Sequence, residues 1–322
     1  MNREFGVSFG CFGGTCLLVA TGGVEAGIAA KLRLLDWHAR YTRFDPASEL
    51  CRLNADPREA VPVSPVLARL AQAIVDAAEL SGGLVDGTLA RELEAAGYRS
   101  DLDGSLPLRR AADPRPARPR SDARWRGLSV DGAVVRRPPG LAIDSGGLGK
   151  GLFADLVAED LRGQEAFAIE CAGDLRVGGT AGRRRPVNVE SPFDRSVIHT
   201  FELADAGVAT SGIGRRSWLD ARGRPAHHLL DPSTGLPAFT GVVQATAVAP
   251  TALEAEVRAK AALLSGPERA TDWLPHGGVI VHDDGSHTSV TVPPGGRARA
   301  ERQRHAPGGE GRLRAGAPAP AR

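Results

Sequence analysis

The segment with the clearest chemistry covers residues 144–151, D-S-G-G-L-G-K-G. It follows a short apolar run at residues 141–143 and precedes a helix-like run at residues 152–161. Glycines let backbone N–H groups come close to oxygen anions, and the N-terminus of a helix adds positive potential. Lys150 adds a mobile ammonium, and the Asp144 carboxylate accepts hydrogen bonds. A strand end, a glycine turn and a helix start of this kind predict a site for a phosphorylated ligand.

Two familiar phosphate-binding loops do not match this segment. A P-loop, G-x-x-x-x-G-K-[ST], would need a glycine where Asp144 stands and a hydroxyl residue in place of Gly151. The dinucleotide fingerprint G-x-G-x-x-G is also missing, because the glycines stand at positions 146, 147, 149 and 151. Taken alone, the segment also fits a glycine-rich turn with a solvated lysine, because short glycine motifs often match by chance.

A second cluster, H-L-L-D-P-S-T-G at residues 228–235, contains a candidate general base. Its D-P-S-T-G part has the composition of a tight turn, with an Asx acceptor, a proline and a closing glycine. His228 stands at the end of a predicted strand, where an imidazole can take a proton from a hydroxyl nucleophile. A histidine that only caps the turn is the alternative. His227 would point to the opposite face of the strand.

Three further clusters combine glycines with hydroxyl or carboxylate side chains. They are S-G-G-L-V-D-G-T at residues 81–88, A-G-D-L-R-V-G-G at residues 172–179 and V-A-T-S-G at residues 208–212. Small hydroxyl residues at a glycine turn can contact a phosphate or a ribose. Each cluster alone is also ordinary turn chemistry.

Composition argues against several classes of protein. The formal net charge of +2 does not mark the chain as a nucleic-acid-binding protein. The four cysteines have neither a C-x-x-C spacing nor a paired histidine, so we expect reduced thiols and a cytoplasmic protein. No apolar run reaches the length of a membrane-spanning helix, and the N-terminus lacks the pattern of a signal peptide, so no membrane insertion is expected.

Short strands mixed with a few helices predict an α+β fold. Helices are expected at residues 24–40, after Ser48, and at residues 64–81, 152–161 and 252–264. Strands are expected at residues 12–20, in a hairpin at 128–136, and at 166–170, 185–190, 196–203, 207–210, 227–230, 242–249 and 277–282. We expect one domain over residues 1–291, with a mobile insertion at 101–124 and a basic, disordered tail at 292–322.

The order and spacing of the clusters resemble the FAD:protein FMN transferase (ApbE) family over nearly the whole chain. The matching segments begin with C-F-G-G-T-C at residues 11–16 and Y-T-R-F-D-P-A-S-E-L-C-R-L-N at residues 41–54. The clusters at residues 81–88, 144–151, 172–179, 209–212 and 228–235 follow in the family's order, with Gly87 where the family has proline. Any one motif is weak, but this many in register are a strong indication.

The resemblance implies an α+β fold of two facing subdomains of mixed or antiparallel sheet with packed helices and a ligand cleft between them. It also implies a reaction in which the FMN part of FAD passes to a Ser or Thr hydroxyl of an acceptor flavoprotein and AMP leaves. Two alternatives stay open at this point. One is an FAD pyrophosphatase that releases FMN and AMP, and the other is an FAD-binding protein without turnover.

The resemblance also implies roles for single residues. His228 would be the base that deprotonates the acceptor hydroxyl. The residues implied to bind FAD are Thr42, Asn54, Asp86, Asp144, Lys150, Ser211, Asp231 and Thr234. The flavin would contact Thr42, Asn54, Asp86 and Asp144, Lys150 would sit near the ligand, and Ser211 and Thr234 would line the nucleotide side.

The helix expected after the last long strand departs from the family pattern. The family reads A-D-x-x-x-T there, and its Asp and Thr bind Mg²⁺ beside a backbone carbonyl of the glycine loop, here Gly147. This sequence has Glu256 and Lys260 at the two positions. Glutamate can still ligate a hard cation, whereas a charged lysine has no acceptor. The alternatives are a displaced Mg²⁺ site, a Lys260 ammonium that neutralises the pyrophosphate, and a solvated i,i+4 ion pair.

Overall fold

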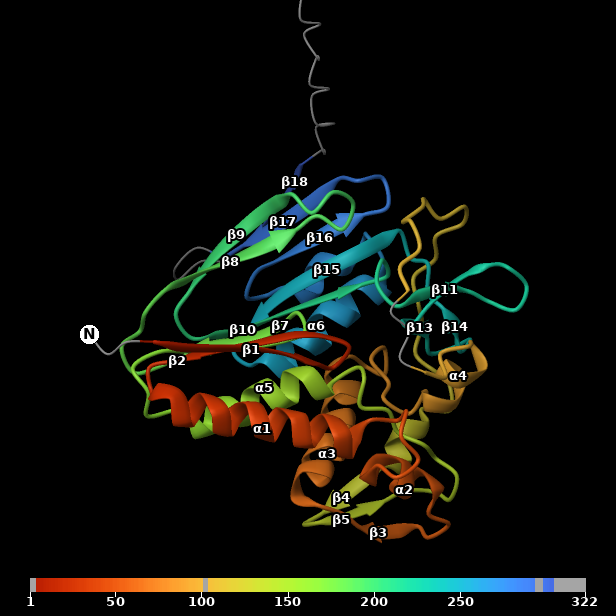
Figure 1. Ribbon diagram of the computed structural model, residues 1–322. Coiled ribbons are helices and arrows are strands. Elements are labelled where there is room, and N and C mark those ends of the chain that lie inside the picture. Colours follow the sequence, from red (N-terminus) through yellow and green to blue (C-terminus); the bar gives the residue numbers. More distant parts are fainter. Residues whose placement is uncertain (1–3, 101–103, 293–297, 304–322) are drawn as a thin grey trace, which may run out of the picture.

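The computed structural model describes residues 4–100, 104–292 and 298–303. Its centre is one antiparallel sheet with the strand order β1-β2-β6-β7-β10-β15-β16-β17-β18 (Figure 1). These strands are β1 (Phe5–Cys11), β2 (Gly14–Ala20), β6 (Phe167–Cys171), β7 (Asp174–Gly178), β10 (Ala206–Gly212), β15 (Val242–Ala249), β16 (Gly278–His282), β17 (His287–Thr291) and β18 (Arg299–Gln303). With the helices beside it, this sheet confirms the predicted α+β class.

Three long helices pack against the central sheet, and Figure 1 shows two of them, α1 and α5, below it. α1 (Gly23–Tyr41) contacts β1 and β2, α5 (Gly149–Asp160) contacts β6 and β7, and α6 (Ala252–Ser265) contacts β10 and β15. The other helical elements are α2 (Glu49–Ala55), α3 (Pro65–Leu80), α4 (Ala90–Ala95), and the 3₁₀ turns η1 (Arg124–Gly127) and η2 (Ala270–Trp273). Ser48, Ser64 and Thr251 start α2, α3 and α6, because each hydroxyl accepts a hydrogen bond from the backbone N–H three residues later.

The described residues also form four small sheets. They pair β3 (Ala60–Pro62) and β4 (Ser129–Asp131) with β5 (Val134–Arg136), β8 (Arg185–Glu190) with β9 (Val197–Leu203), β11 (Ser217–Leu219) with β12 (Pro225–His227), and β13 (Leu230–Asp231) with β14 (Leu236–Pro237). The β8–β9 hairpin lies on the side of the central sheet away from α1 and α5 (Figure 1). Val187 and Phe201 of this hairpin pack against Val208 of the sheet.

The buried residues form two large hydrophobic cores. The first joins α1, α3 and α5 to β2 and β6, and it includes Leu34, Phe153 and Ile169. The second joins α6 to β15 and β16, and it includes Leu264 and Ile280. These cores correspond to the two facing parts expected from the sequence, although both share the central sheet.

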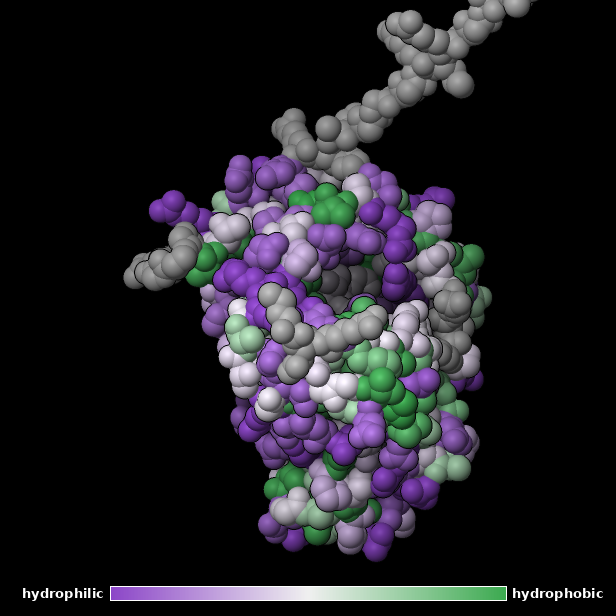
Figure 2. Space-filling view, turned by 60° about the vertical axis from the view of Figure 1, so that its left-hand side comes forward, coloured by the Kyte–Doolittle hydropathy of each residue, from purple (hydrophilic) through white to green (hydrophobic). Residues whose placement is uncertain are grey.

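Among the described residues, no helix combines the length and the apolar character needed to cross a membrane. Figure 2 shows a face on which hydrophilic residues predominate and hydrophobic residues gather in small groups. Cys11, Cys16, Cys51 and Cys171 are free thiols.

Three predicted strands differ from the structure. The strand expected at residues 12–20 starts at Gly14, because Phe12 and Gly13 have φ angles of 55° and 68° and form the turn of the β1–β2 hairpin. Residues 141–143 are not part of a sheet. The strand expected at residues 227–230 is broken, because β12 and β13 pair in different small sheets. The apolar pattern predicts that each of these segments pairs with a neighbouring strand. In the structure, the backbone instead forms a turn or hydrogen-bonds to a distant side chain.

The expected insertion and tail are only partly described. Residues 101–103 lie outside the described residues, and residues 104–123 contain neither helix nor strand. The backbone N–H groups of Arg115 and Ala117 donate to the carbonyls of Phe239 and Leu264, so this segment is tied to the second core. The prediction of a wholly disordered tail is wrong for Arg299–Gln303, which form β18 beside β17. Polar residues can pair in this way because the hydrogen bonds of a sheet edge involve only the backbone. Residues 293–297 and 304–322 of the tail lie outside the described residues.

α5 and α6 approach each other closely at their N-terminal ends. A Cβ atom placed on Gly151 would lie 2.7 Å from the carbonyl oxygen of Ala252 and 2.8 Å from the Cα of Leu253. Both neighbours are backbone atoms, so they cannot turn away as a side chain can. The glycine at this position is therefore required by the distance between the two helices.

We predict that Gly151→Ala lowers the free energy of unfolding by about 1–3 kcal/mol, because the methyl group must push the two helices apart. Gly163→Ala is the matched control, because a Cβ there meets no heavy atom within 4 Å. It should change the free energy by less than about 0.5 kcal/mol. Urea denaturation followed by circular dichroism measures both, and equal effects of the two substitutions would show that the close approach is not real.

Candidate active site

One pocket collects most of the side chains that the sequence singled out. The glycine loop, residues 144–149, forms one wall, and the C-terminal end of α1, the segment 84–87, the segment around His228 and part of α6 form the others. The pocket holds about 1230 Å³ of space, part of it open to solvent. It is lined by members of both hydrophobic cores, such as Phe153 and Leu264. The pocket therefore lies in the cleft between the two parts of the fold.

Asn54 fixes the entry to the glycine loop. Its Nδ2 donates to the carbonyl of Ile143 at 2.8 Å, and its Oδ1 accepts from the N–H of the same residue at 2.9 Å. The amide thus takes the place of a neighbouring strand, which explains why residues 141–143 lie outside the sheet. Asn54 does not itself line the pocket.

Two further hydrogen bonds hold the loop. The hydroxyl of Ser145 donates to the carbonyl of Tyr41 at 2.7 Å, which ties the loop to the end of α1. The N–H of Asp144 donates to the carbonyl of Gly87 at 2.9 Å, which ties it to the segment after α3. The end of α1 and the segment after α3 therefore both position the glycine loop.

Asp86 and Asp144 place two buried carboxylates in the pocket. The Oδ1 of Asp86 accepts from the N–H and the hydroxyl of Thr88 at 2.8 and 2.6 Å. Within the described residues, the Oδ2 of Asp86 and the Oδ1 of Asp144 have no hydrogen-bond partner. Burial raises the pKa of both carboxyls. Because an unpaired buried acceptor is costly, these oxygens are suited to accept from a ligand N–H or hydroxyl.

Arg43 is a pocket residue that the sequence reasoning missed. Its Nε lies 3.4 Å from the Oδ1 of Asp144, and one of its terminal nitrogens donates to the carbonyl of Tyr98 at 2.6 Å. The guanidinium carbon lies 4.3 Å from the ring centroid of Phe44 and 4.5 Å from that of Tyr98. The sequence feature that could have marked Arg43 as a pocket residue is its position beside Thr42 in the Y-T-R-F segment. Arg43 orients the carboxylate of Asp144, and its guanidinium packs against the two aromatic rings.

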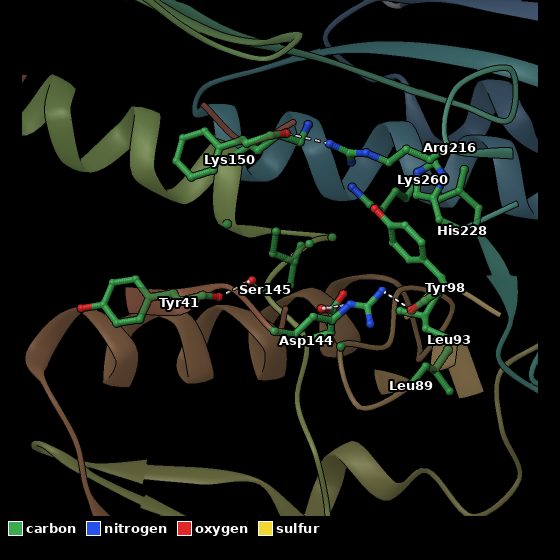
Figure 3. Close-up of a pocket in the computed structure, with 18 of the residues that line it drawn as sticks. Tyr41, Leu89, Leu93, Tyr98, Asp144, Ser145, Lys150, Arg216, His228 and Lys260 are labelled. Atoms are coloured by element: carbon green, nitrogen blue, oxygen red, sulfur yellow. Dashed lines mark hydrogen bonds and ion pairs between the residues drawn. The ribbon is translucent and has the colours of Figure 1, made fainter. Parts of the chain in front are cut away.

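Aromatic side chains line two separate parts of the pocket. In the first group, Phe153 lies with its ring centroid 5.7 Å from that of Phe12 and 5.8 Å from that of Tyr41. In the second, Tyr98 lies 5.5 Å from Phe44 and 6.4 Å from the ring of His228. Figure 3 shows Tyr41 and Tyr98 on opposite sides of the view, with Ser145 of the glycine loop between them.

Lys150 and Lys260 bring two ammonium groups to the pocket, each held by buried carboxylates. The Nζ of Lys150 donates to Asp174 and lies 3.6 Å from the Oε1 of Glu256. The Nζ of Lys260 donates to the same Oε1 at 3.0 Å. The Oε2 of Glu256 accepts from the N–H of Gly151 at 3.0 Å. The carboxylates are 1% exposed and the lysine side chains 13% and 11%, and of these four residues only the two lysines line the cavity.

Burial and mutual attraction act against each other in this cluster. Burial and the like charge of Glu256 raise the pKa of Asp174 to about 7, although Lys150 opposes the shift. Burial would raise the pKa of Glu256 too, but Lys260 and Lys150 outweigh it and the net shift is downward. For Lys150, burial would lower the pKa, but Asp174 and Glu256 together raise it. Glu256 is therefore an anion and Lys150 a cation at neutral pH.

His228 faces the pocket, and its neighbour does not. The Nδ1 of His228 is buried and has no hydrogen-bond partner in the part of the chain that the structure describes. Burial, together with the positive charges of Arg216, His227 and Lys260, lowers the pKa of His228 well below its ordinary value. The imidazole is therefore neutral near pH 7 and able to take a proton. His227 turns its Nδ1 to the N–H of Leu229 instead.

Arg216 closes the pocket beside His228. It adopts a left-handed conformation with φ 52°, and its guanidinium donates to the carbonyl of Phe12 at 2.8 Å (Figure 3). This hydrogen bond links the turn of the β1–β2 hairpin to the segment before β11. A guanidinium, an imidazole and two ammonium groups thus surround one cavity, and such an arrangement can stabilise charge at a phosphate.

Comparison with known proteins identifies the family. The ApbE family model matches residues 12–281. This chain belongs to the ApbE family. The FAD:protein FMN transferase of Rhodobacter capsulatus is 29% identical over 282 residues, and that of Salmonella typhimurium is 26% identical over 291 residues. The alignments cover 81% and 83% of this chain and 51% and 81% of the two relatives.

Coverage differs among the relatives. The FAD:protein FMN transferase of Escherichia coli K12 is 30% identical over 150 residues, which is 45% of this chain and 42% of the relative. The chain thus aligns with less than half of that protein. The ApbE protein of Thermotoga maritima has a TM-score of 0.71 at 24% identity and covers 88% of this chain and 96% of its own. The apo flavinyl transferase ApbE of Pseudomonas stutzeri has a TM-score of 0.70 at 21% identity, with coverages of 93% and 94%. These similarities confirm the ApbE fold.

Four of the residues predicted to bind FAD line the pocket, and four do not. Thr42, Asp86, Asp144 and Lys150 line it, as do His228 and Gly147. Asn54, Ser211, Asp231 and Thr234 do not. Ser211 is buried in β10 opposite Ala245, and Asp231 accepts hydrogen bonds from Arg118, Ser233 and its own turn. Their contact with a ligand stays a prediction of the family resemblance.

The residues at the expected metal position do not form a Mg²⁺ site. Both oxygens of Glu256 are taken by N–H donors, and the Lys260 ammonium has no lone pair to offer. The described residues contain no group of three or more His, Cys, Asp or Glu side chains arranged to hold a metal ion. The donor set at Gly147, Glu256 and Lys260 therefore does not fit a hard divalent cation, which prefers six or more oxygen ligands.

We predict that the imidazole of His228 titrates below about 6.5, the ordinary value for histidine. Arg216→Met should raise this pKa, because it removes a nearby positive charge. NMR titration of the histidine C2 protons measures both, with His228→Gln assigning the signal. Since the unfolded chain takes the proton at higher pH than the folded one, His228 also causes stability to fall as the pH drops through 6.5. A titration at or above 6.5 would contradict the buried, cation-flanked environment.

Proposed function

We propose that this chain transfers the FMN moiety of FAD to a Ser or Thr hydroxyl of an acceptor flavoprotein and releases AMP. The observation that carries the proposal is the ApbE family match over residues 12–281 together with a pocket that unites Lys150, His228 and two buried carboxylates. The named activity of the Rhodobacter and Salmonella relatives supports it. A cytoplasmic location stays a prediction from the cysteines.

The shape and chemistry of the pocket suit FAD. FAD carries two ring systems, the isoalloxazine and the adenine, joined by a chain that contains a pyrophosphate. The pocket has two aromatic groups, and the glycine loop with its ammonium groups lies between them (Figure 3). The Oδ2 of Asp86, which has no hydrogen-bond partner among the described residues, can accept from the ring N–H of a flavin or from the hydroxyls of its side chain. The carboxylate of Asp144, which is ion-paired with Arg43, can do the same.

In the proposed reaction, the acceptor hydroxyl oxygen attacks the phosphorus of the FMN half. The new P–O bond forms as the bond to the bridging oxygen breaks, and AMP departs with that oxygen. The hydroxyl proton passes to the neutral imidazole of His228. Lys150 and backbone N–H groups of the glycine loop balance the charge on the phosphate oxygens. The protein mainly positions reactants and stabilises charge, as is usual for phosphoryl transfer.

The proposal is tested by incubating the purified chain with FAD and an acceptor domain that carries an unmodified target Ser or Thr. We predict that the acceptor gains the mass of FMN less one water and that AMP appears in equal amount. The same acceptor with its target residue changed to Ala is the control and should gain nothing. Free FMN with unmodified acceptor would instead indicate an FAD pyrophosphatase. Bound but unchanged FAD would indicate a binding protein without turnover.

We further predict that His228→Ala lowers the transfer rate by at least about 10²-fold, the usual contribution of a positioned general base. FAD affinity, measured by quenching of flavin fluorescence, should change by no more than about threefold. His276→Ala is the matched control, because that side chain is 46% exposed and lies outside the pocket. Transfer at the wild-type rate by His228→Ala would show that another group takes the proton.

A further inference from the structure

The side chain of Lys260 lies against the glycine loop, at the place where the family resemblance puts a metal. A Cβ built on Gly147 would lie 3.5 Å from the Cε of Lys260. Apart from the chain neighbours of Gly147, no other described residue would lie within 4 Å of that Cβ. Lys260 also lines the pocket. The ammonium group therefore sits beside the loop residue whose carbonyl was expected to ligate Mg²⁺.

Glu256 keeps this ammonium in place. Its Oε1 accepts from the Nζ of Lys260 at 3.0 Å, and its Oε2 accepts from the N–H of Gly151 at 3.0 Å. A metal ion at this carboxylate would have to displace both donors and bring a double positive charge next to two lysines. The charge repulsion and the lost hydrogen bonds both oppose metal binding here.

The composition of the chain gives an independent indication. Of its 40 Lys and Arg residues, only three are lysines: Lys31, Lys150 and Lys260. Two of these three line the pocket. A lysine is a compact point charge with three donors, whereas an arginine is a wide planar fork. A chain that uses arginine almost everywhere else thus places two of its three lysines in this pocket, beside Arg43 and Arg216.

We propose that Lys260 is a phosphate-binding catalytic residue that neutralises the pyrophosphate of the substrate in place of a divalent cation. This inference rests on the proposed function. Among the described residues, Glu256 holds one of the three N–H donors of the ammonium, which leaves two for phosphate oxygens. As the bond to the bridging oxygen breaks, negative charge grows on the departing AMP, and a fixed ammonium at this position stabilises it. Neither FAD binding nor transfer then requires Mg²⁺.

The test begins with the wild-type chain and needs no mutation. The protein is freed of metal with a strong chelator, and FAD binding and flavin transfer are measured with and without added Mg²⁺. We expect the dissociation constant and the transfer rate to agree within about twofold in the two conditions. A dissociation constant or a rate that improves at least tenfold with Mg²⁺ would overturn the proposal.

Lys260→Met should weaken FAD binding by at least tenfold and lower the transfer rate by about 10²–10³-fold, the usual effect of removing one charge-stabilising donor. Added Mg²⁺ should not rescue it. Lys31→Met is the matched control, because Lys31 lies on α1 near Phe9 and outside the pocket, and it should behave as the wild type. Urea denaturation checks that both variants fold. Wild-type binding and transfer by a folded Lys260→Met would also overturn the proposal.

The two readouts separate this proposal from the proposed function. If the wild type transfers no flavin in either condition, the transferase function is wrong. The role of Lys260 is then decided by FAD binding alone, through its dependence on Mg²⁺ and on Lys260→Met. If transfer occurs but requires Mg²⁺, the transferase function stands and the role of Lys260 is wrong.

Discussion

The geometry of the pocket depends on a reciprocal contact between the starts of α5 and α6. Glu256 of α6 accepts a hydrogen bond from the N–H of Gly151 in α5. In return, Asp155 of α5 accepts from the N–H groups of Ala252 and Leu253, both at 2.9 Å. The first N–H groups of a helix have no partner within the helix, and a carboxylate there complements the helix dipole. Each helix thus caps the other, and the glycine loop that leads into α5 is fixed to the helix that carries Lys260.

The same contact contributes to the charge balance of the pocket. Glu256 and Asp174 compensate Lys150 and Lys260, which allows two cations to be held at a largely buried position. Asp174, with a pKa of about 7, is the member that can lose its charge near neutral pH. An anionic ligand attracts the lysines and favours protonation of Asp174, so the cluster can become more positive as a phosphate arrives.

The sequence predicted the elements and motifs that depend on local signals. Ser64 and Pro65 gave the start of α3, and the glycine loop with Lys150 was found from residue types alone. Contacts between distant segments could not be predicted in this way. The amide of Asn54, for example, holds Ile143, which is 89 residues away. Arg43 was missed because its role arises from Asp144 and Tyr98, which local spacing does not reveal.

Glu256 and Lys260 are best understood as one change from the family pattern. With threonine in place of Lys260, Glu256 would lose one of the two ammonium groups that keep it charged while buried. With Lys260 but without Glu256, the N–H of Gly151 and the ammonium would both lose their acceptor. The carboxylate that ligates a metal in the family pattern serves here as a helix cap and a counter-ion. In the proposed role of Lys260, the positive charge at the phosphates is carried by a side chain that the fold itself holds in place.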